Sequence, residues 1–318
     1  MQYKNIYSNH LLKIRIFTNS KPILRLVDNF LDFTGINLSK PKIKIDFYLD
    51  EVNSKNRNDG ENFLYQDWPG KSNNLLSSLG KRIVTVVADP KRGQVKATIL
   101  NYQESYKERL FDSIFTQPLH FILARYGLFF LHASVVSKGK DCILITGPQD
   151  SGKSTLALTL AQNGFKLVAD DDCFVKLIRR QTQLFPFPTK MGLNDKILER
   201  YQELKKHTLK SFRYGGKRRL SLNSISNSNS AKSYSCKMII FPKYKADRII
   251  SINRLSKQEA MNRLAKENPI IYSKRSFEKM FWTLYDLTRQ ADFFEFTYND
   301  NNLNKIAGAI KKAGNFKD

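Results

Sequence analysis

Apolar and polar side chains alternate along several short segments in the first third of the chain, namely residues 12–17, 42–47, 82–87 and 95–100. A period of two places every second side chain on one face, which is typical of half-buried β-strands. Pro90 and Gly93 lie between the last two segments and suit a tight turn, so a hairpin is predicted there. Residues 53–74 are polar and predict a long loop. Residues 1–104 are therefore predicted to be a strand-rich module, to which the sequence assigns no role.

The periodicity changes to that of a helix after residue 104. Apolar side chains recur at helical spacing between residues 104 and 126, and Pro118 inside this stretch predicts a kink or a split. Residues 128–136, 141–146 and 165–169 predict strands, and residues 153–162 predict a helix that ends before Gly164. A strand, a glycine loop, a helix and a second strand form a βαβ unit. The fold class predicted for residues 105–318 is therefore α/β.

The remaining segments extend this second domain. Residues 238–241 and 248–252 predict two more strands, and the Ser/Asn-rich residues 221–235 predict a loop. Ser256 and Glu259 match a capping box that opens a helix through about residue 266. A last helix is predicted over residues 302–313.

Composition narrows the class of protein. Among the 318 residues, 41% are hydrophobic, which provides a real core and excludes disordered and fibrous classes. No apolar run is long enough to span a membrane. The N-terminus lacks the apolar core of a secretory signal, and the three cysteines at spacings of 31 and 63 indicate neither a disulfide framework nor a metal knuckle. The expected location is cytoplasmic.

The charge predicts an anionic partner. The chain holds 53 Lys and Arg against 29 Asp and Glu, a formal net charge of +24. Residues 204–246 contain 11 of these basic residues and no carboxylate. A nucleotide, a nucleic acid, an acidic protein surface or an anionic lipid would complement such a charge.

Residues 147–155 carry the strongest chemical motif, Gly-Pro-Gln-Asp-Ser-Gly-Lys-Ser-Thr, which matches G-x-x-x-x-G-K-[ST]. It lies between an apolar strand and a helix, where backbone amides form an anion nest. Lys153 is predicted to reach the β- and γ-phosphates of ATP, and Ser154 to offer its hydroxyl to Mg²⁺. The predicted nucleotide-binding residues are Gly147, Ser151, Gly152, Lys153, Ser154 and Thr155.

Three acids follow the next predicted strand, at Asp170, Asp171 and Asp172. In an open parallel sheet they would face the glycine loop, because ligands bind at the carboxyl ends of the strands. One carboxylate is predicted to hold Mg²⁺, with Asp171 assigned to the metal beside Ser154. A neighbouring carboxylate would accept a hydroxyl proton. Asp172 is interpreted as a loop or capping acid.

Two further candidates are a histidine and a basic loop. His132 lies on the strand before the glycine loop; by itself, such a histidine is more often a core residue than a catalyst. Arg213, Lys217 and Arg218 flank Gly215 and Gly216. An arginine here could stabilise the transferred phosphoryl group or grip an acidic substrate, while a solvated basic loop is the alternative.

The segment from Leu128 to Phe174 resembles the catalytic domain of the bacterial HPr kinase/phosphorylase family, whose fold is similar to the nucleotide-binding core of phosphoenolpyruvate carboxykinases. The resemblance rests on Leu131-His132-Ala133, on the glycine loop, and on residues 167–171, Leu-Val-Ala-Asp-Asp. It implies an ATP-dependent kinase acting on a serine hydroxyl. His132 and Asp170 match the family's catalytic residues, and Lys153 and Ser154 match its nucleotide and metal residues.

Two departures qualify what the resemblance implies. The chain lacks the family's Glu-x-Arg-Gly-Leu-Gly-type signature, which argues against HPr as the substrate and against reverse phosphorolysis. Asp150 places a carboxylate inside the loop that cradles phosphate. Either its side chain turns outward or it weakens nucleotide binding, because the repulsion at about 4 Å is roughly 4 kcal/mol at an effective dielectric near 20.

Three functions remain open on the sequence. The first is a serine kinase with Mg²⁺ and ATP whose substrate is an acidic protein or peptide; its catalytic residues are Asp170, Asp171, His132 and Lys153. A small-molecule kinase would need a closed acceptor pocket instead. A nucleotide-dependent nucleic-acid-binding protein is less favoured, because no helix-turn-helix, zinc or stacking signature is present.

Overall fold

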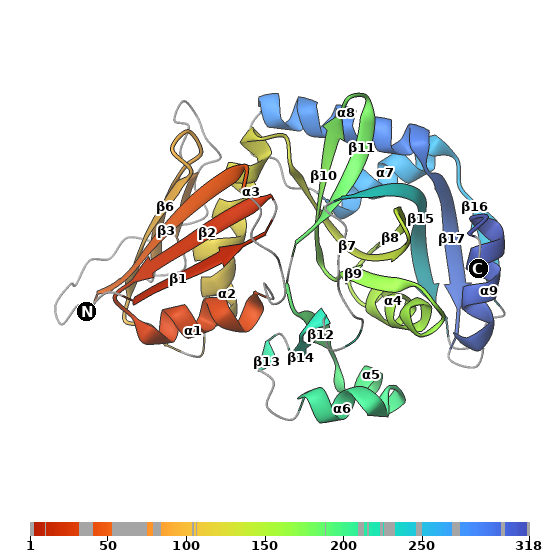
Figure 1. The fold of residues 1–318 in the computed structure, drawn as a ribbon, viewed down its shortest axis with the longest axis horizontal. Helices are drawn as coiled ribbons and strands as arrows, with labels where there is room; N and C mark the ends of the chain where they lie inside the picture. The colour runs from red at the N-terminus through yellow and green to blue at the C-terminus, as the bar shows by residue number, and fades with distance from the viewer. Residues whose placement is uncertain are drawn as a thin grey trace. The chain divides into compact units, whose positions relative to one another are not determined.

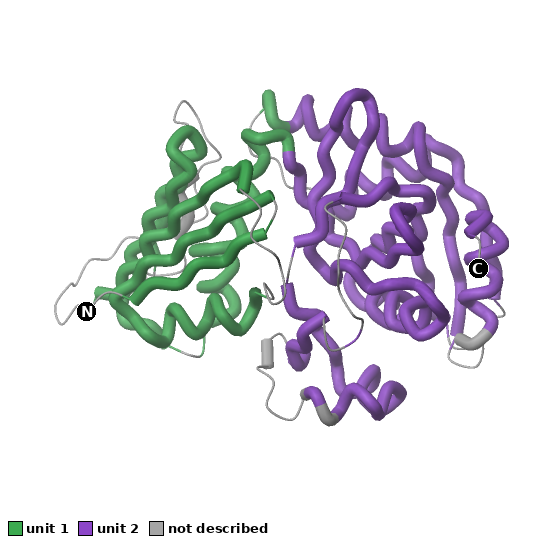
Figure 2. Tube along the Cα trace, in the orientation of Figure 1, with its two compact units in different colours: residues 1–127, 271–276 green, residues 128–270, 277–318 purple. Residues whose placement is uncertain are grey.

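The chain forms two compact units, residues 1–127 with 271–276 and residues 128–270 with 277–318 (Figure 2). The structure is a computed structural model. It describes residues 3–9, 11–31, 41–52, 75–78, 84–103, 105, 107–187, 189–208, 213–214, 216–222, 225, 233–245, 250–268, 274–299 and 303–316. The predicted loop at residues 53–74 lies outside these ranges, as does most of the one at residues 221–235.

The first unit is built on a six-stranded sheet in the order β1-β2-β3-β6-β5-β4 (Figure 1). Its strands are β1 (Tyr3–Ser8), β2 (Leu12–Thr18), β3 (Ile43–Val52), β4 (Leu75–Ser78), β5 (Val84–Asp89) and β6 (Gln94–Leu100). The four alternating segments of the sequence are β2, β3, β5 and β6, and the predicted antiparallel hairpin of β5 and β6 is confirmed. The alternation did not reveal β1 or β4.

Helices cover one face of this sheet and decide where the unit ends. They are α1 (Lys21–Phe30), α2 (Lys107–Phe111), a π-helical turn η2 (Asp112–Thr116) and α3 (Gln117–Arg125). The predicted interruption of the helical stretch falls at η2, directly before Pro118. Phe111 stacks on Phe30 at 3.8 Å between ring centroids, and Phe115 on Phe47 at 4.8 Å. This packing places residues 105–127 in the first unit, so the boundary lies at residue 127 rather than at residue 104.

An eight-stranded mixed sheet forms the centre of the second unit. Seven strands follow the order β11-β10-β7-β8-β15-β17-β16, and β9 pairs with β7. They are β7 (Phe129–Lys138), β8 (Asp141–Thr146), β9 (Lys166–Ala169), β10 (Asp172–Ile178), β11 (Gln181–Pro186), β15 (Tyr234–Tyr244), β16 (Ser251–Arg254) and β17 (Asp292–Tyr298). The α/β class predicted from the sequence is confirmed.

The sheet is not the open parallel sheet that the sequence predicts. β8 runs parallel to β15, but β7 lies beside β8 and is antiparallel to it. β9 and β10 are both antiparallel to β7. β8 and β9 therefore run in the same direction with β7 between them, and their carboxyl ends still lie at one edge of the sheet.

Helices pack on both faces of this sheet. α4 (Lys153–Gln162) and α9 (Leu303–Ala313) share a core with β8, β15 and β17 that includes Leu156, Ile145, Ile240 and Ile306. α7 (Lys257–Glu267) lies on the other face, where Arg263 stands over the ring of Phe241. The predicted Ser256 cap is present, since its hydroxyl accepts the amide hydrogen of Glu259.

The second unit also contains α5 (Asp195–Arg200), α6 (Gln202–Thr208) and a small sheet in the order β12-β14-β13. The three strands are β12 (Met191–Leu193), β13 (Arg213–Tyr214) and β14 (Lys217–Leu220). Helix α8 (Lys274–Gln290) belongs to this unit from residue 277 onward, and its first three residues belong to the first unit. Within the part of the chain that the structure describes, no helix is long and apolar enough to cross a membrane.

The hairpin turn of the first unit yields a stability prediction. Gly93 and Gly139 have the same left-handed φ of 64°, but a Cβ on Gly93 would lie 2.6 Å from the carbonyl oxygen of Lys44, whereas a Cβ on Gly139 meets nothing within 4 Å. We expect Gly93→Ala to cost about 3 kcal/mol of unfolding free energy and Gly139→Ala about 1 kcal/mol. Urea unfolding of the two variants measures the difference, and equal losses would contradict the steric argument.

Candidate functional site

The glycine motif forms the turn between β8 and α4. Gly152 caps α4 with a left-handed φ of 96°, and its carbonyl oxygen accepts a hydrogen bond of 2.8 Å from the Tyr298 hydroxyl. A Cβ at this position would collide with that hydroxyl. Glycine is therefore required both by the backbone conformation and by the close approach of β17, which holds the turn against the sheet.

Lys153 is the first residue of α4, and its side chain bends back over the loop. Its Nζ donates to the carbonyl oxygens of Gly147 and Pro148, at 2.8 and 2.9 Å. The residue is 6% exposed, and burial lowers the pKa of its amine, although the nearby Asp171 and Asp170 act in the opposite direction. The amine is thus held at the mouth of the loop by two carbonyl groups, which an incoming anion can replace.

Asp170 follows β9 and is completely buried. Its Oδ1 accepts hydrogen bonds from the Ser134 hydroxyl of β7 at 2.6 Å and from the Ser154 hydroxyl of α4 at 3.1 Å. Burial raises the pKa of this carboxyl group to about 6; the charge of Asp171 adds to the rise and the two hydroxyl donors oppose it. A buried carboxylate without a cation is costly, so this position favours a proton or a positive ion.

The carboxylate of Asp171 is not in the buried position of Asp170 but lies beside His132. The Asp171 backbone has a left-handed φ of 64° and lies between Ala169, where β9 stops pairing with β7, and Asp172, where β10 begins to pair with it. Its carboxylate lies 4.0 Å from Nε2 of His132. Burial lowers the pKa of His132, while Asp171 raises it. The net lowering keeps the imidazole neutral near pH 7, in the form that accepts a proton. The backbone amide of His132 donates to Asn268 at the end of α7, at 2.7 Å.

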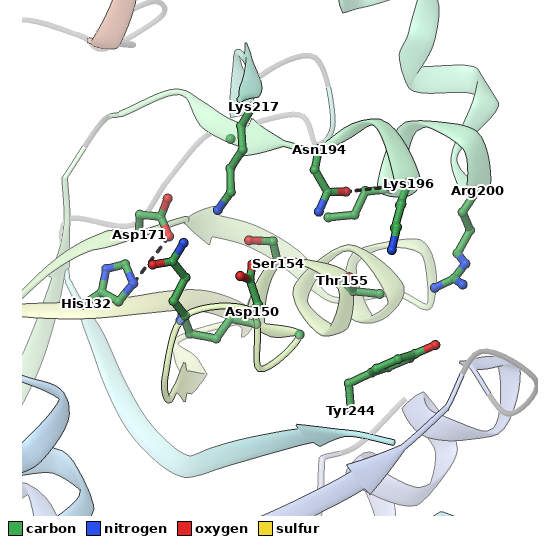
Figure 3. Close-up of a pocket in the computed structure, with 15 residues that line it drawn as sticks. His132, Asp150, Ser154, Thr155, Asp171, Asn194, Lys196, Arg200, Lys217 and Tyr244 are labelled. Carbon is green, nitrogen blue, oxygen red and sulfur yellow. Dashed lines mark hydrogen bonds and ion pairs between the residues drawn. The ribbon is translucent and has the colours of Figure 1, made fainter. Parts of the chain in front are cut away.

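The glycine loop, Lys153, Asp171 and His132 meet at a cavity of about 660 Å³ (Figure 3). Of the residues predicted from sequence, the lining contains Gly152, Lys153, Ser154, Thr155, His132, Asp171 and Lys217. Gly147, Ser151 and Asp170 do not line it: the first two belong to the loop, and Asp170 lies behind Ser154. The geometry therefore pairs Ser154 with Asp170, not with Asp171.

The basic loop contributes unevenly to the cavity. Lys217 reaches it from β14, on the side opposite the glycine loop (Figure 3). The guanidinium Nε of Arg218 instead lies 3.6 Å from Asp195, and Arg213 is its backbone partner across β13 and β14. The sequence left open whether the side chain of Asp150 turns away from the phosphate site. Asp150, at a φ of 59°, lines the cavity and therefore does not turn away from it.

Further lining residues were missed by sequence reasoning: Gln149, Gly192, Asn194, Lys196, Ile197, Arg200 and Tyr244. Most belong to β12 and α5, which lie about 40 residues after the motif in the sequence. The only local signal is Asn194, whose side chain caps α5 by accepting the Ile197 amide hydrogen at 2.9 Å. A cap indicates where a helix begins and does not reveal what that helix faces.

Comparison with known proteins gives a limited result. Neither a protein-family model nor a curated protein matches the chain. Among solved structures, it is similar to the Hpr(Ser) kinase/phosphatase from Coxiella burnetii, with 14% sequence identity and a TM-score of 0.32. The match covers 58% of this chain and 94% of that chain. A likeness of this size defines neither a family nor an activity for this chain.

The oxygen donors of Ser154, at the cavity, and of Asp170, buried behind it, suit Mg²⁺ better than a transition metal. Ser154 and Asp170 offer a hydroxyl and a carboxylate oxygen 3.1 Å apart. Among the described residues, no group of three or more His, Cys, Asp or Glu side chains could hold a metal ion. Mg²⁺ is commonly bound by one or two protein oxygens, with water and substrate phosphates completing its shell. These two residues fit that pattern when a nucleotide is present.

The raised pKa of Asp170 predicts a pH-dependent stability. Because the native state binds this proton more tightly than the unfolded state, the stabilising contribution is present at pH values below about 4 and is lost as pH rises through about 6. Asp170→Asn lacks this loss, so its stability relative to the wild type should increase between pH 4 and pH 7 by on the order of 3 kcal/mol.

Urea unfolding of both proteins without nucleotide across this pH range measures the effect. Glu278→Gln, at an exposed position on α8, is the matched control and should follow the wild type at every pH. A difference between Asp170→Asn and wild type that does not change with pH would refute the assignment.

Proposed function

We propose that this protein is an ATP-dependent phosphotransferase that moves the γ-phosphoryl group of ATP to a serine hydroxyl of an acidic protein or peptide. The observation that carries the proposal is the convergence of Lys153, Ser154, Asp171 and His132 on one cavity. An anion nest at a helix N-terminus, a lysine, an oxygen pair for Mg²⁺ and a base are the parts that phosphoryl transfer requires.

In this proposal the loop amides and Lys153 hold the β- and γ-phosphates, and Lys153 exchanges the carbonyl oxygens of Gly147 and Pro148 for phosphate oxygens. Ser154 and the buried Asp170 would hold Mg²⁺, and the ion when bound would neutralise charge on the phosphates. Asp170 would be ionised in that state, because a nearby cation lowers a carboxyl pKa. This assignment moves the metal role from Asp171 to Asp170, since Ser154 contacts Asp170.

Asp171 and His132 are then the groups that handle the proton. Both line the cavity, and a neutral imidazole beside a carboxylate can accept a proton from an acceptor hydroxyl. The acceptor oxygen forms a bond to the γ-phosphorus as the bond from that phosphorus to the β–γ bridging oxygen breaks. The hydroxyl proton passes to the Asp171–His132 pair, and ADP leaves with the electron pair of the broken bond.

Lys217 completes the charge arrangement. Its positive charge acts on Lys153, Asp170 and His132 from the side opposite the glycine loop. A cation there is placed to neutralise the equatorial oxygens of the transferred group, as arginine fingers do in other phosphoryl-transfer enzymes. Asp150 opposes nucleotide binding from within the loop, and the cations Lys196, Arg200 and Lys217 on the other wall offset it.

A small-molecule kinase is the second candidate function. The observation that favours it is the concave shape of the cavity, whose volume lies in the range of small-molecule sites and whose second wall carries Lys196 and Arg200. Transfer of phosphate to a small anionic alcohol, with no transfer to any peptide, would select this candidate.

The first test of the proposed function is transfer of radiolabelled γ-phosphate from ATP to acidic serine peptides, with mapping of the phosphosite. Lys153→Ala and Asp170→Asn should each lower the rate at least about a hundredfold, because one removes a phosphate ligand and the other a metal ligand. Lys140→Ala, at an exposed turn, is the control. A wild-type protein that gives no heat on titration with magnesium-ATP would contradict the proposal.

Lys217 provides a second, independent test. Lys217→Met should lower kcat about a hundredfold while the Kd for magnesium-ATP changes less than about threefold, because the cation acts on charge that develops during transfer. Lys217→Arg should restore part of the rate, and Lys266→Met on the exposed side of α7 is the control. If Lys217→Met weakens ATP binding as much as it slows transfer, Lys217 is a ground-state nucleotide ligand instead.

A further inference from the structure

The first unit has a second face, directed away from α1 and Phe115. On β2, Leu12, Ile14 and Ile16 are fully buried under the helices, and the alternate side chains point to the other face. The strand register sets four of these outer side chains in one row across β1, β2, β3 and β6: Lys4, Phe17, Tyr48 and Lys96. Both lysines are exposed, and both rings are partly exposed. Two aromatic rings thus lie between two cations.

The rings of Phe17 and Tyr48 contact each other, and Phe17 also contacts two cations. Phe17 and Tyr48 stack with 5.0 Å between their centroids and an interplanar angle of 10°. Nζ of Lys4 lies 5.4 Å from the Phe17 centroid, and Cζ of Arg15 lies 5.7 Å from it. The Phe17 ring therefore contacts Tyr48 and two cations. Phe17 lies on the β2 side of Tyr48, and β6 lies on the other side.

A hollow of about 400 Å³ lies on that side of Tyr48. Its described lining residues are Tyr48, Asp50, Gln94, Lys96, Ala97 and Thr98, all from β3 and β6. Tyr48 supplies an aromatic wall, while Gln94 and Thr98 supply an amide and a hydroxyl. A planar ring with a polar edge fits such a slot, because stacked rings are favourable and the edge can form hydrogen bonds.

The charge around the hollow selects an anionic ligand. The outer face carries Lys4, Lys13, Arg15, Lys44 and Lys96 on four adjacent strands. The acids that these four strands place on this face are Asp46 and Asp50, and Asp89 follows on the neighbouring strand β5, opposite Gln94. Asp46 is bound by Arg15, whose Nε donates at 2.6 Å, and Asp89 lies 3.7 Å from Nε of Arg92. The four lysines therefore share this face with Asp50 as the one acid that forms no ion pair among the described residues. Such a surface attracts and orients negatively charged partners.

We propose that this face is the docking site for an acidic peptide segment that carries an aromatic side chain, which inserts beside Tyr48 while flanking carboxylates contact Lys4 and Lys96. The inference rests on the proposed function, since it names the surface that would recruit the peptide substrate. A single-stranded nucleic acid fits less well. Its successive bases stack on several rings, whereas Tyr48 is the one aromatic side chain among the described residues that line this hollow, and the carboxylate of Asp50 lines it too.

Calorimetric titration of the full chain with the peptide EDSYEDE, without ATP, tests the proposal. Lys4→Glu combined with Lys96→Glu should weaken binding at least about tenfold, because each change replaces an attraction with a repulsion. Lys21→Glu combined with Arg25→Glu on α1 alters the charge equally on the opposite side of the sheet, and should change the Kd less than about twofold. Thermal melting verifies that each variant is folded.

Tyr48→Ala and the peptide EDSAEDE form a double-mutant cycle. Each single change should weaken binding about fivefold, and the two together should cost no more than one, because they remove the same contact. Additive losses would overturn the placement of the aromatic ring.

Equal losses in the α1 control and in the Lys4/Lys96 variant would overturn the docking site. Tighter binding of oligo(dT)15 than of the peptide, lost in the Lys4/Lys96 variant, would assign the face to nucleic acid and overturn the peptide proposal. Titration of the same preparations with magnesium-ATP reports on the proposed function separately, because the glycine loop lies in the other unit.

Discussion

The candidate site depends on one strand, β7, which pairs with β8 on one side and with β9 and β10 on the other. Because β7 is antiparallel to all three, the ends of β8 and β9 emerge at the same edge of the sheet. The glycine loop follows β8 and the acidic pair follows β9. Ser134 of β7 lies between them and donates to Asp170. Removing this shared strand would separate the loop from the acids.

The site is held together by polar groups that are costly without a ligand. Asp170 is buried with two hydroxyl donors and no cation among the described side chains that contact it, and the amine of Lys153 is bound by two backbone carbonyls. A metal ion and a polyphosphate would satisfy both groups at once, since one supplies the positive and the other the negative charge. Such preorganisation is what electrostatic catalysis requires, because the dipoles are placed before the reaction begins.

The basic side chains are placed differently in the two units. In the second unit, Lys217 alone among the three predicted basic residues is assigned to the cavity, while Arg218 faces Asp195. In the first unit, the register of four strands gathers lysines that are up to 92 residues apart, Lys4 and Lys96, into one row. Under the two proposals, one unit holds the acceptor peptide and the other transfers the phosphoryl group.

The sequence by itself determined the elements whose signals are local. The alternation of β2, β3, β5 and β6, the glycine loop before α4, and the Ser256 cap each depend on residues a few positions apart, and the structure contains all of them. The tertiary structure decided what depends on pairing between distant segments: the antiparallel insertion of β7, the contact of Ser154 with Asp170, and the wall formed by Asn194, Lys196 and Arg200. Periodicity records which face of a strand is buried, but it carries no information about which strand lies beside it.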